Sequence, residues 1–134
     1  NVRVELIIRG MCSLYPGREG LSESISVVSI IGQFLEHSRI FWFGNGGSPE
    51  VYIGSADWMS RNLDRRVEAV TPVEDANLRG RLERLLELYL KDNRGAWDMQ
   101  SDGSFIQRQP EDGEDVRNSQ VQLIKQWSQG VPQS

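Results

Sequence analysis

Cysteine and histidine are almost missing from this chain, and each shortage excludes a class of protein or site. The 134 residues contain one cysteine, Cys12, and one histidine, His37. A single cysteine cannot form an internal disulfide, which fits a protein of the reducing cytosol, and we expect Cys12 to be a buried, inert thiol. One histidine, one cysteine and dispersed carboxylates do not make a zinc site, so the sequence predicts no metal ligands.

Long hydrophobic runs are also absent. No apolar run approaches the about 20 residues of a membrane-spanning helix, and we recognise no signal peptide. The hydrophobic content of 38% is enough for a packed core. We therefore expect residues 1–134 to form a single domain, with 128–134 as a frayed tail. Because the chain starts at Asn1 and continues directly into a strand-like run, we also expect it to be a segment of a longer protein.

Lysine is missing from the first half of the sequence. Residues 1–66 hold seven acidic residues and seven basic ones, all of them arginine: Arg3, Arg9, Arg18, Arg39, Arg61, Arg65 and Arg66. Residues 67–134 hold eight basic and twelve acidic residues, which gives the net charge of −4. This balance argues against broad nucleic-acid binding. Arginine presents a planar fork that suits phosphate oxygens, so a local arginine-lined phosphate site is compatible with the sequence.

The hydrophobic patterns predict a mixed α/β protein. A leucine stripe at helical spacing predicts a helix over 74–91 whose apolar side joins the core. Weaker patterns predict a second helix over 116–127, a short helix or turn over 31–36, and a helical turn over 57–63 that Asp57 caps. Runs rich in β-branched and aromatic residues, or alternating polar and apolar ones, predict strands at 2–9, 25–30, 40–43, 51–53, 66–71, 97–99 and 104–108.

The chemistry concentrates around His37. Arg39 follows two residues later, and a predicted hairpin then leads to a small-polar corner at Gly54 and Ser55. Phosphoryl transfer needs positive charge on the phosphate oxygens and a group that exchanges a proton, and imidazole can be that group or the nucleophile. Arg9 follows the first predicted strand, and ligands of open α/β sheets gather beyond the carboxyl ends of strands. The competing interpretations are a structural or solvated histidine and a surface arginine.

Several motifs in register resemble one family, the large bacterial polyphosphate kinases, over about residues 2–75. They are Ile8-Arg9-Gly10-Met11-Cys12-Ser13-Leu14-Tyr15-Pro16-Gly17, Gly20-Leu21-Ser22-Glu23, Phe34-Leu35-Glu36-His37-Ser38-Arg39, Asn45-Gly46-Gly47 and the run from Ser55-Ala56-Asp57-Trp58 to Arg66. The similarity is to the C-terminal portion of those enzymes. It implies an α/β, phospholipase-D-like fold, a mixed sheet flanked by helices. The phospholipase His-x-Lys motif has Arg39 in place of lysine here, and Gly44 stands where an aspartate is expected, which argues against phosphodiester hydrolysis.

The resemblance implies an ATP:polyphosphate phosphotransferase. Such an enzyme transfers the terminal phosphate of ATP reversibly to polyphosphate through a phosphohistidine, which would lie in a preceding domain. By motif position, His37 is expected to be a second active-site histidine acting as general acid or base. Arg9 is expected to bind nucleotide phosphate and Arg66 to face the phosphate tunnel, with Arg39 and Arg61 as further phosphate-binding candidates.

The same resemblance implies the ligands and partners. They are ATP or ADP, inorganic polyphosphate, Mg²⁺ carried with the nucleotide, and the preceding domains of the same chain. We expect an isolated fragment to be inactive, and the whole enzyme to be a cytoplasmic homo-oligomer able to associate with a membrane. Two alternatives stay open, a phospholipase-D-like phosphodiesterase with His37 as nucleophile and a non-catalytic module that binds nucleotide or polyphosphate.

Overall fold

The protein consists of two compact units, here called unit 1 (residues 1–36 and 88–134) and unit 2 (residues 37–87). The computed structural model describes residues 2–10, 12–128 and 130. None of the helices formed by these residues is long and apolar enough to cross a membrane. Two compact units can belong to one cooperatively folding domain, so the single-domain expectation stays a prediction.

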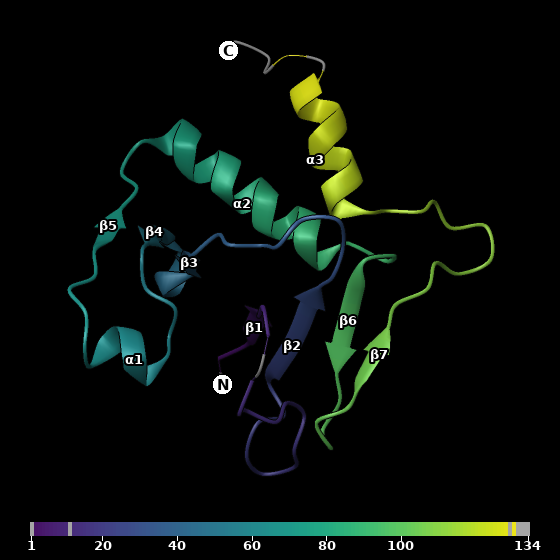
Figure 1. The fold of residues 1–134 in the computed structure, drawn as a ribbon, viewed down its shortest axis with the longest axis horizontal. Helices are drawn as coiled ribbons and strands as arrows, with labels where there is room; N and C mark the ends of the chain where they lie inside the picture. The colour runs from purple at the N-terminus through teal and green to yellow at the C-terminus, as the bar shows by residue number, and fades with distance from the viewer. Residues whose placement is uncertain (1, 11, 129, 131–134) are drawn as a thin grey trace. The chain divides into compact units, whose positions relative to one another are not determined.

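Unit 1 is built on a four-stranded mixed sheet of β1 (Val4–Ile7), β2 (Ile25–Ile30), β6 (Ala96–Met99) and β7 (Phe105–Gln107). The strand order is β1-β2-β6-β7, with β1 parallel to β2 and the other neighbours antiparallel (Figure 1). The β-branched run in β2 favours an extended strand. Val27, Val28 and Ile30 are buried there and form the centre of the core with Ala96 and Met99.

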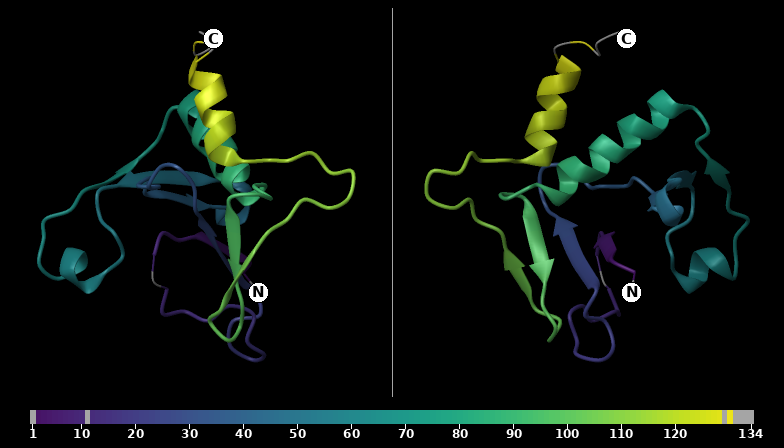
Figure 2. Two further views of the ribbon diagram at one scale, coloured as in Figure 1. Left: turned by 45° about the vertical axis from the view of Figure 1, so that its right-hand side comes forward. Right: turned by 180° about the vertical axis from the view of Figure 1, so that it is seen from behind.

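A buried aspartate connects the end of α2 (Ala76–Leu90) to β6 and to the start of α3 (Ser119–Ser128) in unit 1. Asp92 is 1% exposed. Its Oδ1 accepts the N–H groups of Arg94, Gly95 and Ala96 at 2.8, 2.6 and 3.2 Å, and its Oδ2 accepts the N–H and hydroxyl of Ser119 at 2.6 and 2.7 Å. The carboxylate therefore pairs with a backbone N–H at the N-terminus of α3 that has no partner within the helix. Figure 2 shows this N-terminus close to the carboxyl end of β2.

Arg108 closes the same side of unit 1. Its guanidinium donates twice to the Asp98 carboxylate, at 2.7 Å each, and to the carbonyls of Leu90 and Asp92 at 2.6 and 3.2 Å. The planar fork of arginine permits this bidentate pairing. One side chain thus links strand β6 to the chain that leaves α2.

Unit 2 holds a three-stranded antiparallel sheet of β3 (Ile40–Phe43), β4 (Glu50–Gly54) and β5 (Val70–Pro72), in that order. The hairpin between β3 and β4 turns through the 3-10 segment η1 (Asn45–Gly47), whose residues all have positive φ values, 41°, 60° and 101°. Glycine adopts this conformation without steric cost, which explains the sequence of the turn. Helix α1 (Ser60–Leu63) lies between β4 and β5, and α2 begins in unit 2 and ends in unit 1.

The structure confirms most predicted elements, including the hairpin of 40–43 with 51–53, the strands at 97–99 and 104–108, and the helix over 74–91, which is observed as Ala76–Leu90. Three expectations in the first two-thirds of the chain are wrong in part. Residues 31–36 form bends and no helix, and α1 starts at Ser60 with Met59 as its N-cap, so Asp57 does not cap it. The strand expected over 66–71 is observed as β5, Val70–Pro72, which includes Pro72. Proline has no N–H to donate, and an edge strand tolerates it because one side of that strand has no neighbouring strand to bond.

Smaller corrections concern the burial of individual side chains. The stripe on α2 buries Tyr89 fully, but Leu78 is 49% exposed and does not join the core. Cys12 is only half-buried and donates its thiol hydrogen to the Leu14 carbonyl at 3.5 Å. Ser128, where the expected frayed tail begins, is the last residue of α3 and donates to the Ile124 carbonyl at 2.8 Å, and the tail itself stays a prediction. Residues 129 and 131–134 lie outside the described residues.

Candidate functional site

His37 and Arg39 form the centre of the candidate site in unit 2. His37 is exposed at the start of the segment that becomes β3. An Arg39 terminal nitrogen lies 2.8 Å from His37 Nε2, and the other donates to the His37 backbone carbonyl at 3.3 Å. The structure therefore brings together the imidazole and the guanidinium that the His-x-Arg spacing predicted.

Asp57 holds this pair from the far end of the hairpin. Its Oδ1 accepts the Arg39 Nε–H at 3.1 Å, and its Oδ2 lies 3.8 Å from an Arg61 nitrogen. The side chains of Arg39 and Asp57 are only 18% and 26% exposed, whereas that of Arg61 is 66% exposed. A pair this sheltered is screened less than a surface salt bridge. Asp57 thus joins two of the predicted phosphate-binding arginines.

Glu68 and Ser55 form a second cluster at the corner that follows β4. The Ser55 hydroxyl donates to Glu68 Oε2 and accepts the N–H of Ala69 at 3.0 Å, and the buried Asn62 amide donates to Glu68 Oε1 at 3.0 Å. These bonds fix the corner against the segment that leads into β5. The Gly-Ser corner is therefore engaged with a carboxylate of its own chain.

Two hydrogen bonds and two arginine charges shape the electrostatics of Glu68. The hydrogen bond from Ser55, then that from Asn62, and then the charges of Arg66 and Arg39 hold the pKa of Glu68 below its ordinary value. The exposed Arg66 side chain thus contributes, like Arg39, to the electrostatic environment of Glu68. Four of the five predicted site residues, namely His37, Arg39, Arg61 and Arg66, lie in unit 2, where Asp57 contacts Arg39 and Arg61.

Arg9, the fifth predicted residue, lies in unit 1 just beyond the carboxyl end of β1. It is exposed and donates to the backbone carbonyl of Glu36 at 3.0 Å, the residue that precedes His37 in the chain. This bond links the end of β1 to the segment that precedes His37, within unit 1. A common phosphate site for Arg9 and His37 stays a prediction.

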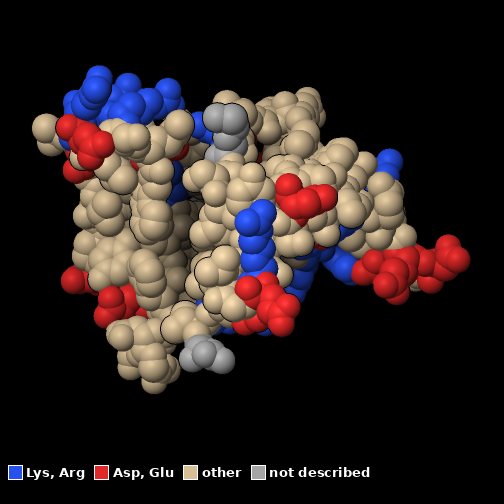
Figure 3. Space-filling view, turned by 90° about the horizontal axis from the view of Figure 1, so that it is seen from below, with Lys and Arg blue, Asp and Glu red and all other residues tan. Residues whose placement is uncertain are grey.

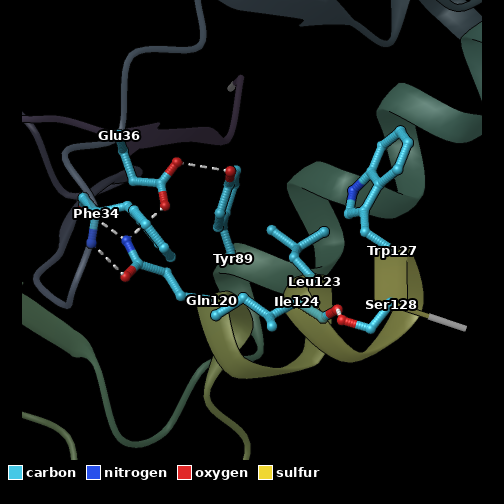
Figure 4. Close-up of a pocket in the computed structure, with 8 residues that line it drawn as sticks. All are labelled: Phe34, Glu36, Tyr89, Gln120, Leu123, Ile124, Trp127 and Ser128. Atoms are coloured by element: carbon cyan, nitrogen blue, oxygen red, sulfur yellow. Dashed lines mark hydrogen bonds between the residues drawn. The ribbon is translucent and has the colours of Figure 1, made fainter.

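Unit 1 also contains an open pocket of about 430 Å³ between the segment before His37 and α3. Glu36 forms its polar end, where its carboxylate accepts the Tyr89 hydroxyl at 2.7 Å and the Gln120 amide at 2.8 Å (Figure 4). Ile124 and Trp127 line the apolar part. The carboxylate makes this pocket a poor phosphate site, and none of the predicted site residues lines it.

Charged side chains are grouped on the surface. Figure 3 shows Lys and Arg atoms in separate groups across a largely uncharged face, with Asp and Glu atoms beside some of them. Among the described residues, no group of three or more His, Cys, Asp or Glu side chains could hold a metal ion. The contacts that define the site of unit 2 therefore join His37 to Arg39, and Arg39 and Arg61 to Asp57.

Sequence reasoning missed the two carboxylates. Asp57 was assigned to a helix cap, and Glu68 carried no role, although both lie at the centre of the contacts. For Asp57 a signal was available, because an acidic residue two positions after the Gly-Ser corner is well placed to meet Arg39 across a hairpin. For Glu68 the sequence offers no comparable signal.

Comparisons with known proteins give one consistent result. The family profile described as polyphosphate kinase C-terminal domain 2 matches residues 1–120. The chain is 99% identical to polyphosphate kinase of Parasynechococcus marenigrum over 134 residues, all of this chain and 19% of that protein. It is 51% identical to polyphosphate kinase of Pseudomonas aeruginosa over 131 residues, 98% of this chain and 19% of that protein.

A solved structure agrees with these relatives. The crystal structure of polyphosphate kinase from Porphyromonas gingivalis matches with a TM-score of 0.88 and 39% identity, covering 96% of this chain and 19% of that one. The expected fold class, phospholipase-D-like α/β with mixed sheets and helices, is confirmed. The chain spans about a fifth of the length of the relatives it matches.

Proposed function

Since this chain belongs to the polyphosphate kinase C-terminal domain 2 family, we propose that it forms part of an ATP:polyphosphate phosphotransferase. The reaction is the reversible transfer of the terminal phosphate of ATP to inorganic polyphosphate. The phosphohistidine that carries the phosphoryl group belongs, in this proposal, to a preceding domain of the longer protein. The observation that carries the proposal is the His37–Arg39 contact of 2.8 Å, inside a chain of this family.

His37 supplies the proton exchange in this proposal. Phosphoryl transfer needs a group that takes up or returns a proton on the attacking or leaving oxygen, and imidazole does this near neutral pH. The exposed His37 ring is open to a substrate oxygen, and Arg39 lies beside it to stabilise the negative charge of the phosphoryl group.

The remaining arginines bind phosphate in this proposal. Arg9 at the end of β1 binds a nucleotide phosphate, and Arg66 and Arg61 bind the polyphosphate chain. Both Arg66 and Arg61 are exposed, and an Arg61 nitrogen lies 3.8 Å from Asp57 Oδ2. Exposed guanidinium groups can reach the phosphate oxygens of a substrate.

We assign Mg²⁺ to the nucleotide and not to this chain. Mg²⁺ needs few protein ligands when phosphates bind it, and the described residues include no group that fits a metal ion. We derive no step through it. ATP or ADP, polyphosphate, the preceding domains of the same chain, a cytoplasmic location and a homo-oligomeric whole enzyme are further parts of the proposal.

The test uses the full-length protein with His37→Ala and Arg9→Ala, and Arg3→Ala as the matched control. Arg3 is an exposed arginine of the same segment as Arg9 and pairs only with Glu5 among the contacts described for its side chain. We expect polyphosphate synthesis from ATP to fall about 100-fold or more for His37→Ala, in the range of a lost general acid or base. Normal synthesis by both variants would refute these roles. Hydrolysis of a simple phosphodiester that depends on His37 would instead favour the phosphodiesterase.

A further inference from the structure

We propose that Asp57 is a positioning residue, which anchors Arg39 so that its guanidinium holds the His37 imidazole in one neutral tautomer. The inference deepens the proposed function and rests on it, because it concerns the histidine to which that proposal assigns the proton exchange. It concerns unit 2 alone, since all three residues lie there.

The first step is the anchoring of Arg39. Its Nε–H donates to Asp57 Oδ1 at 3.1 Å between two side chains that are less than a third exposed. Because the guanidinium is planar and rigid, fixing the direction of Nε also fixes the directions of both terminal nitrogens. Those nitrogens meet the carbonyl and the ring of His37, at 3.3 and 2.8 Å. Asp57 therefore determines where the donors beside His37 point.

The second step is the state of the imidazole. A guanidinium has five N–H donors and no acceptor, so the ring atom 2.8 Å away must provide a lone pair. Nε2 is then unprotonated, and the proton of the neutral ring sits on Nδ1. A proton added to Nε2 would replace this hydrogen bond with two cations in contact. The anchored Arg39 thus selects the tautomer of His37 with Nδ1–H and Nε2 as acceptor.

The third step connects the tautomer to phosphoryl transfer. Among the described residues no contact is given for Nδ1, so Nδ1–H can donate a hydrogen bond to a phosphoryl oxygen, while the Nε2 lone pair is covered by Arg39. A phosphoryl oxygen that takes over the Arg39 N–H uncovers that lone pair, which can then accept the proton of the attacking hydroxyl at the end of the polyphosphate chain. As the new P–O bond forms, the P–N bond of the phosphohistidine breaks, and the imidazolium of His37 then gives its proton to the nitrogen that leaves or to solvent. Arg39 therefore keeps the base covered until an anion arrives.

Arg61 supports the arrangement from the other oxygen of Asp57. The distance of 3.8 Å from Oδ2 to the Arg61 nitrogen leaves the carboxylate between two cations. An asparagine in place of Asp57 keeps the shape of the side chain but removes the charge that attracts both of them. Asp57→Asn is thus the appropriate variant, because it perturbs the position of Arg39 with little change in volume.

The experiment compares full-length wild type, Asp57→Asn, Asp57→Glu and the control Asp64→Asn, an exposed aspartate at the C-cap of α1. We expect Asp57→Asn to lower kcat for polyphosphate synthesis about 10- to 100-fold, the cost of misplaced reacting groups, while KM for ATP stays within about threefold. Asp57→Glu should recover most of the loss. Asp64→Asn should equal wild type, and an equal loss there would overturn the inference.

The second readout is ¹⁵N NMR of the histidine side chains, with His37 assigned by its absence in His37→Gln. Wild type should show one protonated and one unprotonated ring nitrogen for His37, and Asp57→Asn should show two averaged signals as the tautomers interconvert. Unchanged signals in Asp57→Asn would overturn the inference. If Asp57→Asn does not fold, Arg39→Lys decides, because lysine lacks the fork and should also give averaged signals. A wild type that makes no polyphosphate refutes the proposed function, and the spectra then judge this inference separately.

Discussion

Replacing Asp92 with asparagine tests whether one carboxylate organises the end of unit 1. The wild-type side chain accepts five hydrogen bonds at 2.6–3.2 Å. Burial raises the pKa of this carboxyl, but the bonds from Ser119, Arg94 and Gly95 outweigh it and the net pKa lies below the ordinary value. The charged form is thus the one that the fold binds, and an amide can copy only part of it.

The magnitude follows from the donors. The amide oxygen can keep the three N–H groups that Oδ1 accepts, which turns the NH₂ group toward Ser119. The Ser119 hydroxyl can rotate to accept, but the Ser119 N–H then faces another donor in a place where Ser119 is 0% exposed. A buried unsatisfied donor costs about 1–3 kcal/mol, and the remaining bonds lose their charge assistance. We therefore expect local stability to fall by about 3 kcal/mol, which corresponds to about a 100-fold change in the opening equilibrium.

The assay is hydrogen–deuterium exchange of the full-length protein, read at the amides of Arg94, Gly95, Ala96 and Ser119. We expect Asp92→Asn to accelerate exchange there about 100-fold, with Asp112→Asn as the control at an exposed loop aspartate. Unfolding of residues 94–99 and 119–128 as a unit would be an extreme form of the same result. If these amides exchanged within about threefold of wild type, the carboxylate would not organise this region.

Four further predictions concern other contacts. Gly103→Ala should destabilise unit 1 by about 2 kcal/mol more than Gly113→Ala in denaturation or hydrogen exchange. Both glycines have positive φ, 90° and 84°, but only at Gly103 would an added Cβ meet the Tyr15 ring, at 2.6 Å. Equal effects of the two substitutions would contradict this. Arg108→Lys should cost about 1–2 kcal/mol in the exchange of β6 and β7, because lysine cannot form the bidentate pair with Asp98. Arg94→Lys, which loses a single bond to Gln109, should cost less. Ser55→Ala should raise the pKa of Glu68 toward its ordinary value of 4.5 in an NMR titration, since the Ser55 bond is the largest cause of its low value, whereas Ser60→Ala should leave it unchanged. Finally, acid should unfold unit 1 partly through Asp92. The pKa of Asp92 is lower in the folded state than the ordinary 3.8, so its contribution to the free energy of unfolding is complete above pH 3.8 and is lost as the pH falls through the folded-state pKa. Asp92→Asn should therefore make stability less dependent on pH in that range.

Local patterns were sufficient for most of the secondary structure. The β-branched run of β2 predicted a buried strand at Ile25–Ile30, and the leucine spacing predicted α2, because both signals repeat within one element. Residues 31–36 failed for the opposite reason. The backbone of Phe34 is held by the side chain of Gln120, at 2.9 and 2.7 Å, and a partner 86 positions away leaves no periodic trace nearby.

The start of α1 shows how one residue can satisfy a local rule and still serve another purpose. An aspartate before a helical segment commonly caps it, and Asp57 stands at such a position. The structure instead gives its carboxylate to Arg39, 18 positions earlier, while Met59 occupies the N-cap without a side-chain bond. A capping bond is worth about 1 kcal/mol, and the structure shows the carboxylate in the pair with Arg39 instead. Propensity ranks a residue only against its neighbours, so it could not weigh this alternative.

The same limit explains what the sequence revealed about the site. His37 and Arg39 are two positions apart, so a local sequence pattern was enough to predict that they belong to one site. The observed contact follows from that proximity. Asp57 and Glu68 enter only because antiparallel pairing of β3 with β4 and of β4 with β5 folds residues 55–69 back toward position 39. Sheet register therefore decides which carboxylates meet the arginines. A substitution that shifted the register by one residue, without touching any charged side chain, would separate Arg39 from Asp57 as effectively as deleting either of them.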